Sequence, residues 1–476
     1  MKTRFMLGGV ALCGLAMCVG QWSATALPSD GDSDGGVAAG PDVIVGGIPD
    51  VARYAPATWN GVQYASYAIG STSCNIGSAQ LLWIPNPDNR HPVIPQNMYR
   101  VKGGAIEQIG MSWVKHGFCA LQQTLCGSCQ PAGSGCPTVL GIGCSDPYTA
   151  GLNGAQDDLK SRGPINPSTG FFDGDYSDPV SPSGFPSSLR ERIVVARNDL
   201  DPALNPGAAY FAEAQYIHPQ DAASGNAANN ASYRRFSVGT TWSSSAGYPL
   251  TYVGGTVQTQ PAIAAWATIH QDVGIREYDV VGDGRFILAF RTWQNPNGTW
   301  HYEYALFNLN SARCGGSFSV PIPAGVNVTN IGFKSPMYHS GDPYETTPWT
   351  ATLSDGTLRW SCAPNTNPNA NALRWSTMYN FRFDADVAPA ATTGLVQLGL
   401  WKAPTTASPA TQVPMLAAIP STPVVTPPAD LNGDGVINGA DLTALLACWG
   451  SACGDIDDDG TTAGTDLAAL LAAWSS

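Results

Sequence analysis

Charged residues are scarce in this chain, and basic residues are the scarcer kind. Only 12% of the sequence is Asp, Glu, Lys or Arg, and 36 acidic residues face 23 basic ones, which gives a net charge of −13. This balance argues against nucleic acid or an anionic membrane surface as a partner. Beyond the N-terminus no apolar run approaches the roughly 20 residues of a membrane-spanning helix. We therefore expect no membrane span in the mature chain.

Short motifs that mark common enzyme classes are also missing. The sequence contains no Walker phosphate loop, no dinucleotide-binding fingerprint and no HExxH zinc motif. Its six histidines form no HxH unit either. Two possibilities remain. The protein is an enzyme whose catalytic carboxylates lie far apart in the sequence, or it has no catalytic activity.

The first 26 residues have the pattern of a secretory signal peptide. Two basic residues precede an apolar run over residues 5–20, and Ala24-Thr25-Ala26 supplies the small residues that a signal peptidase requires. We therefore expect a secreted protein, extracellular or associated with the cell surface. Residues 1–26 are the predicted signal peptide, and residues 27–41, which are small, polar and acidic, are a predicted flexible lead-in.

Ten of the twelve cysteines lie beyond the signal peptide, in even groups, which predicts about five disulfides in an oxidising compartment. The groups are Cys74, Cys119, Cys126, Cys129, Cys136 and Cys144, then Cys314 with Cys362, and then Cys448 with Cys453. The first six allow 15 pairings, among which the sequence does not choose. Cys126-Gly-Ser-Cys129 also matches a redox or zinc motif, but its Gly- and Pro-rich surroundings favour structural disulfides.

Short β-strands separated by Gly, Pro and Asn account for most of the body. We expect a β-rich, cysteine-stapled domain over residues 42–239 and a β-sandwich domain over residues 240–402. The clearest element is a hairpin of residues 286–294 and 300–308, whose alternating apolar residues flank an Asn-Gly turn. Residues 403–429 are rich in Pro, Thr and Ala and are the predicted linker.

The last 47 residues, 430–476, repeat themselves every 25 residues. DLNGDGVINGADL aligns with DIDDDGTTAGTDL, and a leucine-rich segment with helical spacing follows each copy. Calcium prefers six to eight oxygen ligands, which a twelve-residue loop supplies from positions 1, 3, 5, 7, 9 and 12, with glycine at position 6. The expected calcium ligands are Asp430, Asn432, Asp434, the Val436 carbonyl, Asn438 and Asp441 in the first loop, and Asp455, Asp457, Asp459, the Thr461 carbonyl and Asp466 in the second.

The two loops differ at position 9. Asn438 occupies it in the first loop, whereas Ala463 in the second offers no side-chain oxygen. We expect calcium as the cofactor of both loops, and weaker binding by the second.

This duplicated loop and helix resembles the type I dockerin domain, over the last 47 residues only. The resemblance implies a small all-α module whose partner is a cohesin domain or a cell-surface component. Recognition in that family depends on loop positions 10 and 11, which are Gly439-Ala440 and Gly464-Thr465 here in place of the common hydroxyl pairs. The body is similar to uncharacterised secreted bacterial proteins with the same C-terminal repeat, in segments such as NIGSAQLLWI (75–84), and that similarity implies no activity.

The predicted fold is mainly β, with two disulfide-stabilised, sandwich-like domains and a small calcium-binding α module. Two functions fit this organisation. The first is a secreted, non-catalytic calcium-binding protein that serves surface structure or glycan binding. The alternative is a secreted glycoside hydrolase that degrades polysaccharide and is delivered by its dockerin-like module.

A glycoside hydrolase requires two carboxyl groups roughly 5–10 Å apart. Glu213 and Glu303 lie in aromatic-rich strands and are the candidate acid and base, with Asp221 as a third candidate. A cluster of His91 and His116 with Asp146 is a further hypothesis, although isolated histidines are more often hydrogen-bonded locally.

Overall fold

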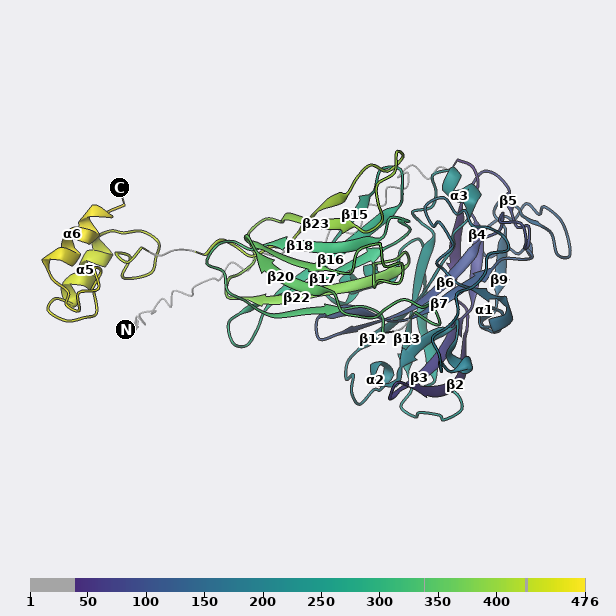
Figure 1. Cartoon of the computed structure of the whole chain (residues 1–476), viewed down its shortest axis with the longest axis horizontal. Coiled ribbons are helices and arrows are strands. Elements are labelled where there is room, and N and C mark those ends of the chain that lie inside the picture. Colours follow the sequence, from purple (N-terminus) through teal and green to yellow (C-terminus); the bar gives the residue numbers. More distant parts are fainter. Residues whose placement is uncertain (1–38, 338, 424–426, 476) are drawn as a thin grey trace, which may run out of the picture. The chain divides into compact units, whose positions relative to one another are not determined.

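The computed structural model describes residues 39–337, 339–423 and 427–475. The predicted signal peptide and most of the predicted lead-in therefore lie outside the described residues. The chain divides into a β-rich body, which spans most of the sequence up to Pro420, and a small C-terminal unit from Ser421 onward. Figure 1 shows that strands dominate the body and that α5 (Gly439–Ala447) and α6 (Gly464–Ala472) are the helices of the small unit. None of the described helices is long and apolar enough to cross a membrane.

The first part of the body contains four antiparallel sheets. The largest has the order β10 (Leu159–Lys160), β7 (Ala105–His116), β6 (Val93–Lys102), β12 (Ala209–Gln215), β13 (Ala231–Val238) and β14 (Leu250–Val257). The smaller sheets are β1 (Val43–Gly47), β4 (Ser71–Asn75) and β9 (Ser145–Tyr148); β11 (Ile193–Ala196), β3 (Val62–Ile69) and β2 (Val51–Trp59); and β5 (Leu81–Leu82) with β8 (Val139–Leu140). The short α-helices of the body are α1 (Ala150–Asn153), α2 (Arg197–Leu200), α3 (Pro219–Ala223) and α4 (Ala265–Ile269).

Two five-stranded antiparallel sheets form the second part of the body. The first sheet has the order β15 (Gly274–Asp279), β16 (Arg285–Gln294), β17 (Trp300–Asn308), β22 (Thr377–Ala385) and β19 (Val328–Lys334), and the second has the order β20 (Thr350–Ser354), β21 (Thr357–Ser361), β18 (Gly315–Pro321), β23 (Gly394–Leu400) and β24 (Gln412–Ala417). Aromatic rings join their inner faces. Phe318 of β18 lies 5.5 Å from Tyr304 of β17 and 4.7 Å from Phe381 of β22, between ring centroids. Burial of such rings is the main source of stability for two stacked sheets.

The predicted hairpin is confirmed as β16 and β17, which pair from Phe286 with Asn308 to Gln294 with Trp300. Its turn closes because the Asn295 N–H donates to the Thr299 carbonyl oxygen, at 2.7 Å, while Gly298 has a φ of +89°. A positive φ is costly for residues with a Cβ, so the glycine fixes the place of the turn.

The two predicted body domains share one core and are not separated at residue 239. β14, from the second region, completes the large sheet of the first. The Met378 N–H donates to Gln108 Oε1 at 2.8 Å, and Asn380 Nδ2 donates to the Ile106 carbonyl at 2.7 Å, so β22 is tied to β7. Buried side chains of both regions, among them Phe211 of β12 and Phe307 of β17, belong to one apolar cluster. The prediction of a domain boundary at residue 239 is wrong, because strands from both predicted domains belong to the same sheet and bury side chains in the same core.

The predicted linker over residues 403–429 is also wrong in part. Gln412–Ala417 forms β24, which pairs with β23 along its whole length. Its side chains alternate, with Val413, Met415 and Ala417 buried and the intervening residues exposed. β24 is an edge strand, where proline is tolerated, and Pro414 lies within it.

Four disulfides are present among the described residues, in place of the expected five or so. They are Cys74–Cys126, Cys119–Cys136, Cys129–Cys144 and Cys448–Cys453. The expected pair of Cys314 and Cys362 is not bonded. Instead, each sulfur lies 3.5 Å from a backbone carbonyl oxygen, that of Ala312 and that of Gly316 respectively, in hydrogen-bonding geometry.

Candidate functional site

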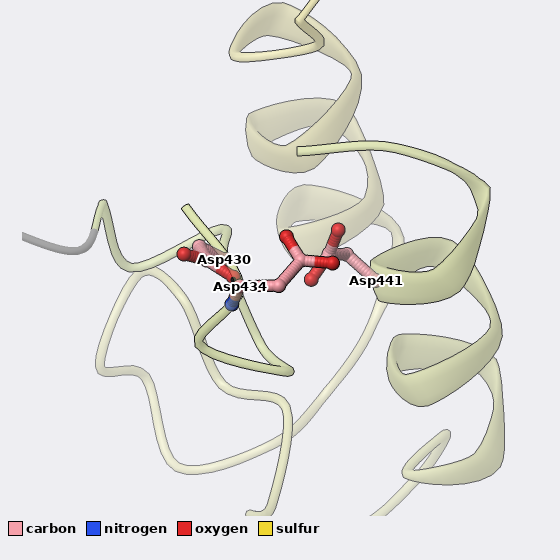
Figure 2. A group of neighbouring side chains, drawn as sticks. All are labelled: Asp430, Asp434 and Asp441. Carbon is pink, nitrogen blue, oxygen red and sulfur yellow. Dashed lines mark hydrogen bonds between the residues drawn. The ribbon is translucent and has the colours of Figure 1, made fainter. Parts of the chain in front are cut away.

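Three carboxylates of the first predicted calcium loop lie together in the C-terminal unit. Asp430, Asp434 and Asp441 each place a ligand oxygen within 4.8 Å of the others. Figure 2 shows the carboxylates of Asp434 and Asp441 turned toward each other, with Asp430 beside them. Calcium binds oxygen at 2.3–2.6 Å, so oxygens on opposite sides of one ion lie roughly 5 Å apart. The cluster therefore has the dimensions of an oxygen shell around one calcium ion.

The backbone of this loop is wrapped around Asp430. The N–H groups of Gly433 and Gly435 donate to the two oxygens of its carboxylate, each at 2.8 Å. The φ angles of these glycines are +74° and +84°, a conformation that turns successive amides toward the loop interior. Asp434 is held in turn, because its Oδ1 accepts the Val436 N–H at 2.9 Å. Hydrogen bonds within the loop thus hold its turn.

The acidic residue at position 12 joins each loop to its helix. Asp441 accepts N–H groups from both Asn432, at 3.1 Å, and Asn438, at 2.9 Å, and so connects the start of the loop to the start of α5. Hydrogen bonds from the Asn438 and Asn432 amides hold the pKa of Asp441 below its usual range. In the second loop Asp466 accepts the Ala463 N–H at 2.7 Å and the Ile456 N–H at 2.6 Å. Both carboxylates are thus kept ionised at the loop–helix junction, as a cation ligand requires.

The second loop gathers a different set of acids. Asp455, Asp457 and Asp459 place ligand oxygens within 4.8 Å of one another, whereas Asp466 is not part of this cluster. Asp458 stands where the first loop has Gly433, and it adopts a φ of +60°. A non-glycine residue in that region is strained by about 1 kcal/mol or more. The second loop is therefore less complete and more strained than the first.

The remaining predicted ligands have roles within their own loops. Asn432 Nδ2 donates to Asp434 Oδ2 at 2.9 Å, and Asn438 Nδ2 donates to the Val436 carbonyl at 3.1 Å. Asn438 Oδ1 caps α5 by accepting the Ala440 N–H at 2.8 Å. The Asn438 side chain thus serves the helix N-terminus, and direct coordination by it would cost that cap. Thr461 is exposed within the second loop, and its N–H donates to Asp459 Oδ1 at 2.9 Å.

The two loop-helix repeats pack against each other as one small core. Leu445 of α5 and Leu470 of α6 are both fully buried in it, together with Ile437. The chain end closes over the first loop, because the Ser475 N–H donates to the Ile437 carbonyl at 2.9 Å. The Cys448–Cys453 disulfide lies between the repeats. We therefore expect that a cation bound in one loop also stabilises the other loop, because both repeats pack on the same core.

Glu213, a candidate catalytic residue, is fully buried on β12. Its carboxylate accepts three hydrogen bonds, from Asn97 Nδ2 and the Tyr99 hydroxyl at 2.8 Å each and from the Ala262 N–H at 2.6 Å. Burial raises the pKa of Glu213 above its usual range. With both oxygens engaged and no solvent access, this carboxylate connects β12 to its neighbours and is closed to a substrate.

Glu303, the second candidate, lies on β17 with 1% of its surface exposed. It accepts Asn380 Nδ2 at 2.9 Å and contacts His301 Nε2 at 3.2 Å. His301 also contacts Asp384 at 2.6 Å, so the imidazole lies between two carboxylates. No hydrogen-bond partner is shared with Glu213. The structure therefore places the candidate acid and base in two separate buried networks.

Asp221, the third candidate, is a fully buried residue of α3. It accepts the Val43 N–H at 2.9 Å and Asn230 Nδ2 at 2.7 Å, and burial raises its pKa to about 8. Its two partners lie on β1 and beside β13, so this carboxyl also connects elements of the fold.

His91 and His116 do come together, but not around Asp146. His91 Nε2 lies 2.8 Å from His116 Nδ1, and His116 Nε2 lies 3.0 Å from the Tyr176 hydroxyl. Asp146 accepts the Leu121 N–H at 2.8 Å instead. The histidine pair joins β7 to the segment before β6, and isolated histidines in the sequence carry no signal for such a pairing.

Comparison of the chain with protein-family models, curated proteins and solved structures gives no match. Functional inference therefore depends on the geometry of the loops and of the body. In that geometry the duplicated acidic loops offer cation ligands, and the three candidate carboxylates of the body do not form an accessible catalytic pair.

Proposed function

We propose that this chain is an exported, non-catalytic protein whose C-terminal unit folds around calcium and attaches the β body to a cohesin domain or another cell-surface component. The observation that carries the proposal is an aspartate cluster in the loop of each repeat, and the two clusters share loop positions 1 and 5. Each loop leads into a helix, and the position-12 aspartate, the third residue of that helix, accepts the N–H of the residue before the helix.

Electrostatics favour a bound cation in these loops. Residues 430–476 contain eight aspartates and no Lys or Arg, so no basic side chain of the unit itself neutralises them. Two carboxylates about 4 Å apart repel each other by about 1 kcal/mol in water and more when partly screened from it. A divalent ion removes this repulsion in both loops, and the folded form is then stabilised by binding.

Oxygen ligands favour calcium over other metals. The clusters contain carboxylates only, and no His or Cys joins them. Zinc and copper favour nitrogen and sulfur ligands, and magnesium requires a tighter octahedral shell with several waters. A flexible loop with a glycine at position 6, here Gly435 and Gly460, suits the larger shell of calcium.

The form of the unit supports the resemblance to dockerin domains. Two loop–helix repeats share one apolar core, and each helix carries an exposed leucine, Leu446 or Leu471, with an exposed tryptophan, Trp449 or Trp474, two residues past its end. Exposed leucine and tryptophan at repeated positions form a surface suited to a protein partner. For the body, the aromatic contacts between its two five-stranded sheets support a sandwich-like architecture.

The non-catalytic part of the proposal follows from the buried carboxylates. A glycosidase pair has to reach a bound sugar from a cleft. Glu213 and Glu303 are at most 1% exposed and are occupied by other side chains. Neither can reach a glycosidic oxygen unless strands of the body separate.

Calorimetric titration of the calcium-depleted full chain tests the metal sites. We expect a stoichiometry of two calcium ions and a gain of helical circular dichroism, with much weaker heat from magnesium at the same concentration. Asp434→Asn and Asp459→Asn should each reduce the stoichiometry to one. An absence of calcium heat, or an unchanged stoichiometry in both variants, would show that the acidic loops are solvated turns.

Surface plasmon resonance with immobilised cohesin domains, or with cell-wall fragments, tests the attachment. Binding should require calcium and should weaken when Trp449 and Trp474 are both replaced by Ala. Calcium binding without capture by either surface would overturn the attachment and leave the metal sites standing.

A further inference from the structure

The outward face of the second five-stranded sheet carries two rows of short polar side chains. Ser317 of β18 lies opposite Ser361 of β21, and on its other side it lies opposite Gly399 of β23. One step along the strands, Ser319 faces Arg359 and Gln397 in the same way. The alternate residues, such as Phe318, point into the core. The face thus carries hydroxyl and amide groups, with Ser317 buried at its floor and Arg359 and Gln397 exposed to solvent.

This face is hollowed into a groove of about 440 Å³, lined by β18, β21, β23 and the segments that follow β21 and β23. Glycines create the hollow. A Cβ added at Gly399 would lie 2.3 Å from Ser317 Oγ, and one at Gly316 would lie 3.0 Å from Trp401 Cδ1. Side chains at these positions would fill the floor. A groove of this size lies within the 300–1,000 Å³ of most small-ligand sites.

One end of the groove is a tryptophan held in place from two sides. Trp401 Nε1 donates to the Ala363 carbonyl at 2.9 Å. The Arg374 guanidinium carbon lies 5.1 Å from the centroid of the Trp401 ring. Trp401 is therefore fixed before a ligand arrives, and a fixed aromatic wall lowers the entropic cost of binding.

The charge in the groove is unlike that of the chain as a whole. Although 36 acidic residues occur in the sequence, no Asp or Glu is among the described residues that line the groove. Arg359 is exposed in it, and its guanidinium forms no ion pair with any residue that the structure describes. An unpaired guanidinium among neutral hydroxyl and amide groups favours a ligand with an anionic substituent.

The lining excludes several ligand classes. An apolar molecule would leave the serine and glutamine groups of the floor unsatisfied. A peptide that extends a sheet binds at an edge, and the edges of this sheet are β20 and β24, whereas the groove lies on its face. A single arginine in a chain of net charge −13 is insufficient for nucleic acid. A ligand that combines hydroxyl groups, an apolar ring face and a few anionic groups matches the polar floor, the Trp401 ring and the Arg359 guanidinium.

We propose that this groove binds an anionic polysaccharide. A sugar ring lies against Trp401 through its C–H face, its hydroxyls exchange hydrogen bonds with Ser319, Ser361 and Gln397, and a carboxylate or sulfate group pairs with Arg359. The site belongs to the body and does not use the calcium loops. Binding at this site is therefore a function additional to the proposed attachment, and each of the two can be tested without the other.

Affinity electrophoresis of the full chain through gels that contain one polymer tests the site. Polygalacturonate supplies carboxylates, dextran sulfate supplies sulfates, and unmodified dextran is the neutral control. We expect retardation by at least one anionic polymer, weaker retardation by dextran, and no change when EDTA removes calcium. Retention by only one anionic polymer identifies the anionic group.

Two variants make the test specific to the groove. Trp401→Ala should weaken binding at least tenfold, and Arg359→Gln should weaken it severalfold and reduce its dependence on salt. Arg359 is exposed and makes no ion pair, so its loss leaves the fold intact, which thermal unfolding confirms. The matched control is Arg235→Gln, at an exposed arginine on β13, which should not change binding.

Three results would overturn the proposal. They are equal retention by neutral and anionic polymers, unchanged binding by Arg359→Gln and Trp401→Ala, and an absence of retention by every polymer. Binding that disappears with EDTA would instead assign the retention to the calcium-binding unit.

Discussion

Replacing Arg162 by Met tests whether the two halves of the body unfold together. This arginine is 3% exposed and donates four hydrogen bonds. Nε donates to the Ser112 carbonyl at 2.6 Å, Nη1 to the Ser376 carbonyl at 3.1 Å, and Nη2 to the Gln96 carbonyl and Asn97 Oδ1 at 3.0 and 3.1 Å. Three of these acceptors belong to β6 and β7, and the fourth immediately precedes β22.

The expected loss follows from this geometry. Methionine keeps most of the aliphatic volume but removes a donor from four buried acceptors, of which the Ser376 carbonyl keeps only a long bond from Gln108 Nε2 at 3.5 Å. Burial lowers the pKa of Arg162 to about 10, so the guanidinium is charged at neutral pH and its bonds are charge-assisted. Each buried acceptor that loses its donor costs about 1–3 kcal/mol, so with partial relaxation we expect a total loss of about 3–5 kcal/mol. That is a large share of the 5–15 kcal/mol by which a typical domain is stable.

Denaturant unfolding followed by hydrogen exchange measures this loss. We expect the transition of the body to shift by this amount with an unchanged slope, and β7 and β22 to lose protection at the same denaturant concentration. Arg235→Met, at an exposed position, should change stability by less than about 0.5 kcal/mol. A shift below about 1 kcal/mol for Arg162→Met would refute the energetic reasoning. Loss of protection in β22 at a separate transition would show that the halves are independent domains.

Two further predictions concern charge. The first loop should be the tighter calcium site, so Asp434→Asn should remove the stronger phase of a calorimetric titration and Asp459→Asn the weaker one, and the reverse order would contradict the ranking of the loops. The second is that stability falls between pH 6.5 and 8. Burial raises the pKa of Asp146 and of Asp221 to about 8, whereas an unfolded aspartate titrates near 4, so the folded state holds the extra protons and loses stability as pH rises through this window. Buried histidines whose pKa is lowered to about 3 oppose this trend only below pH 6.5, where the unfolded histidines bind protons. Denaturation at a series of pH values should show a loss of about 1.4 kcal/mol per pH unit for each carboxyl, and Asp221→Asn should flatten the curve.

Local patterns in the sequence predict those elements whose partners are close in the chain. The hairpin of β16 and β17 is of this kind, because its alternation and its turn are contiguous. β24 was missed although Gln412–Ala417 alternates as a strand should, because proline and small residues around it favour a linker. What makes it a strand is β23, which supplies the backbone partners for an edge position. Composition cannot show that such an edge is available.

The candidate catalytic residues Glu213 and Glu303 lie on strands that are buried on both faces, which is why their sequence pattern did not indicate an accessible site. Alternation assigns every second residue of a strand to solvent, but all seven residues of β12 are buried because layers cover it on each side. A glutamate there has to be satisfied by protein groups, and Glu213 accordingly accepts donors from β6 and from Ala262. Glu303 on β17 meets the same condition through Asn380 Nδ2, which donates to it at 2.9 Å, and through Arg382, whose Nε lies 3.6 Å from its carboxylate. In a fold of stacked sheets, an acidic residue in a doubly covered strand therefore indicates a connection between layers. Side chains that a ligand can reach lie instead where small polar residues leave a groove on a sheet face, as they do beside Trp401.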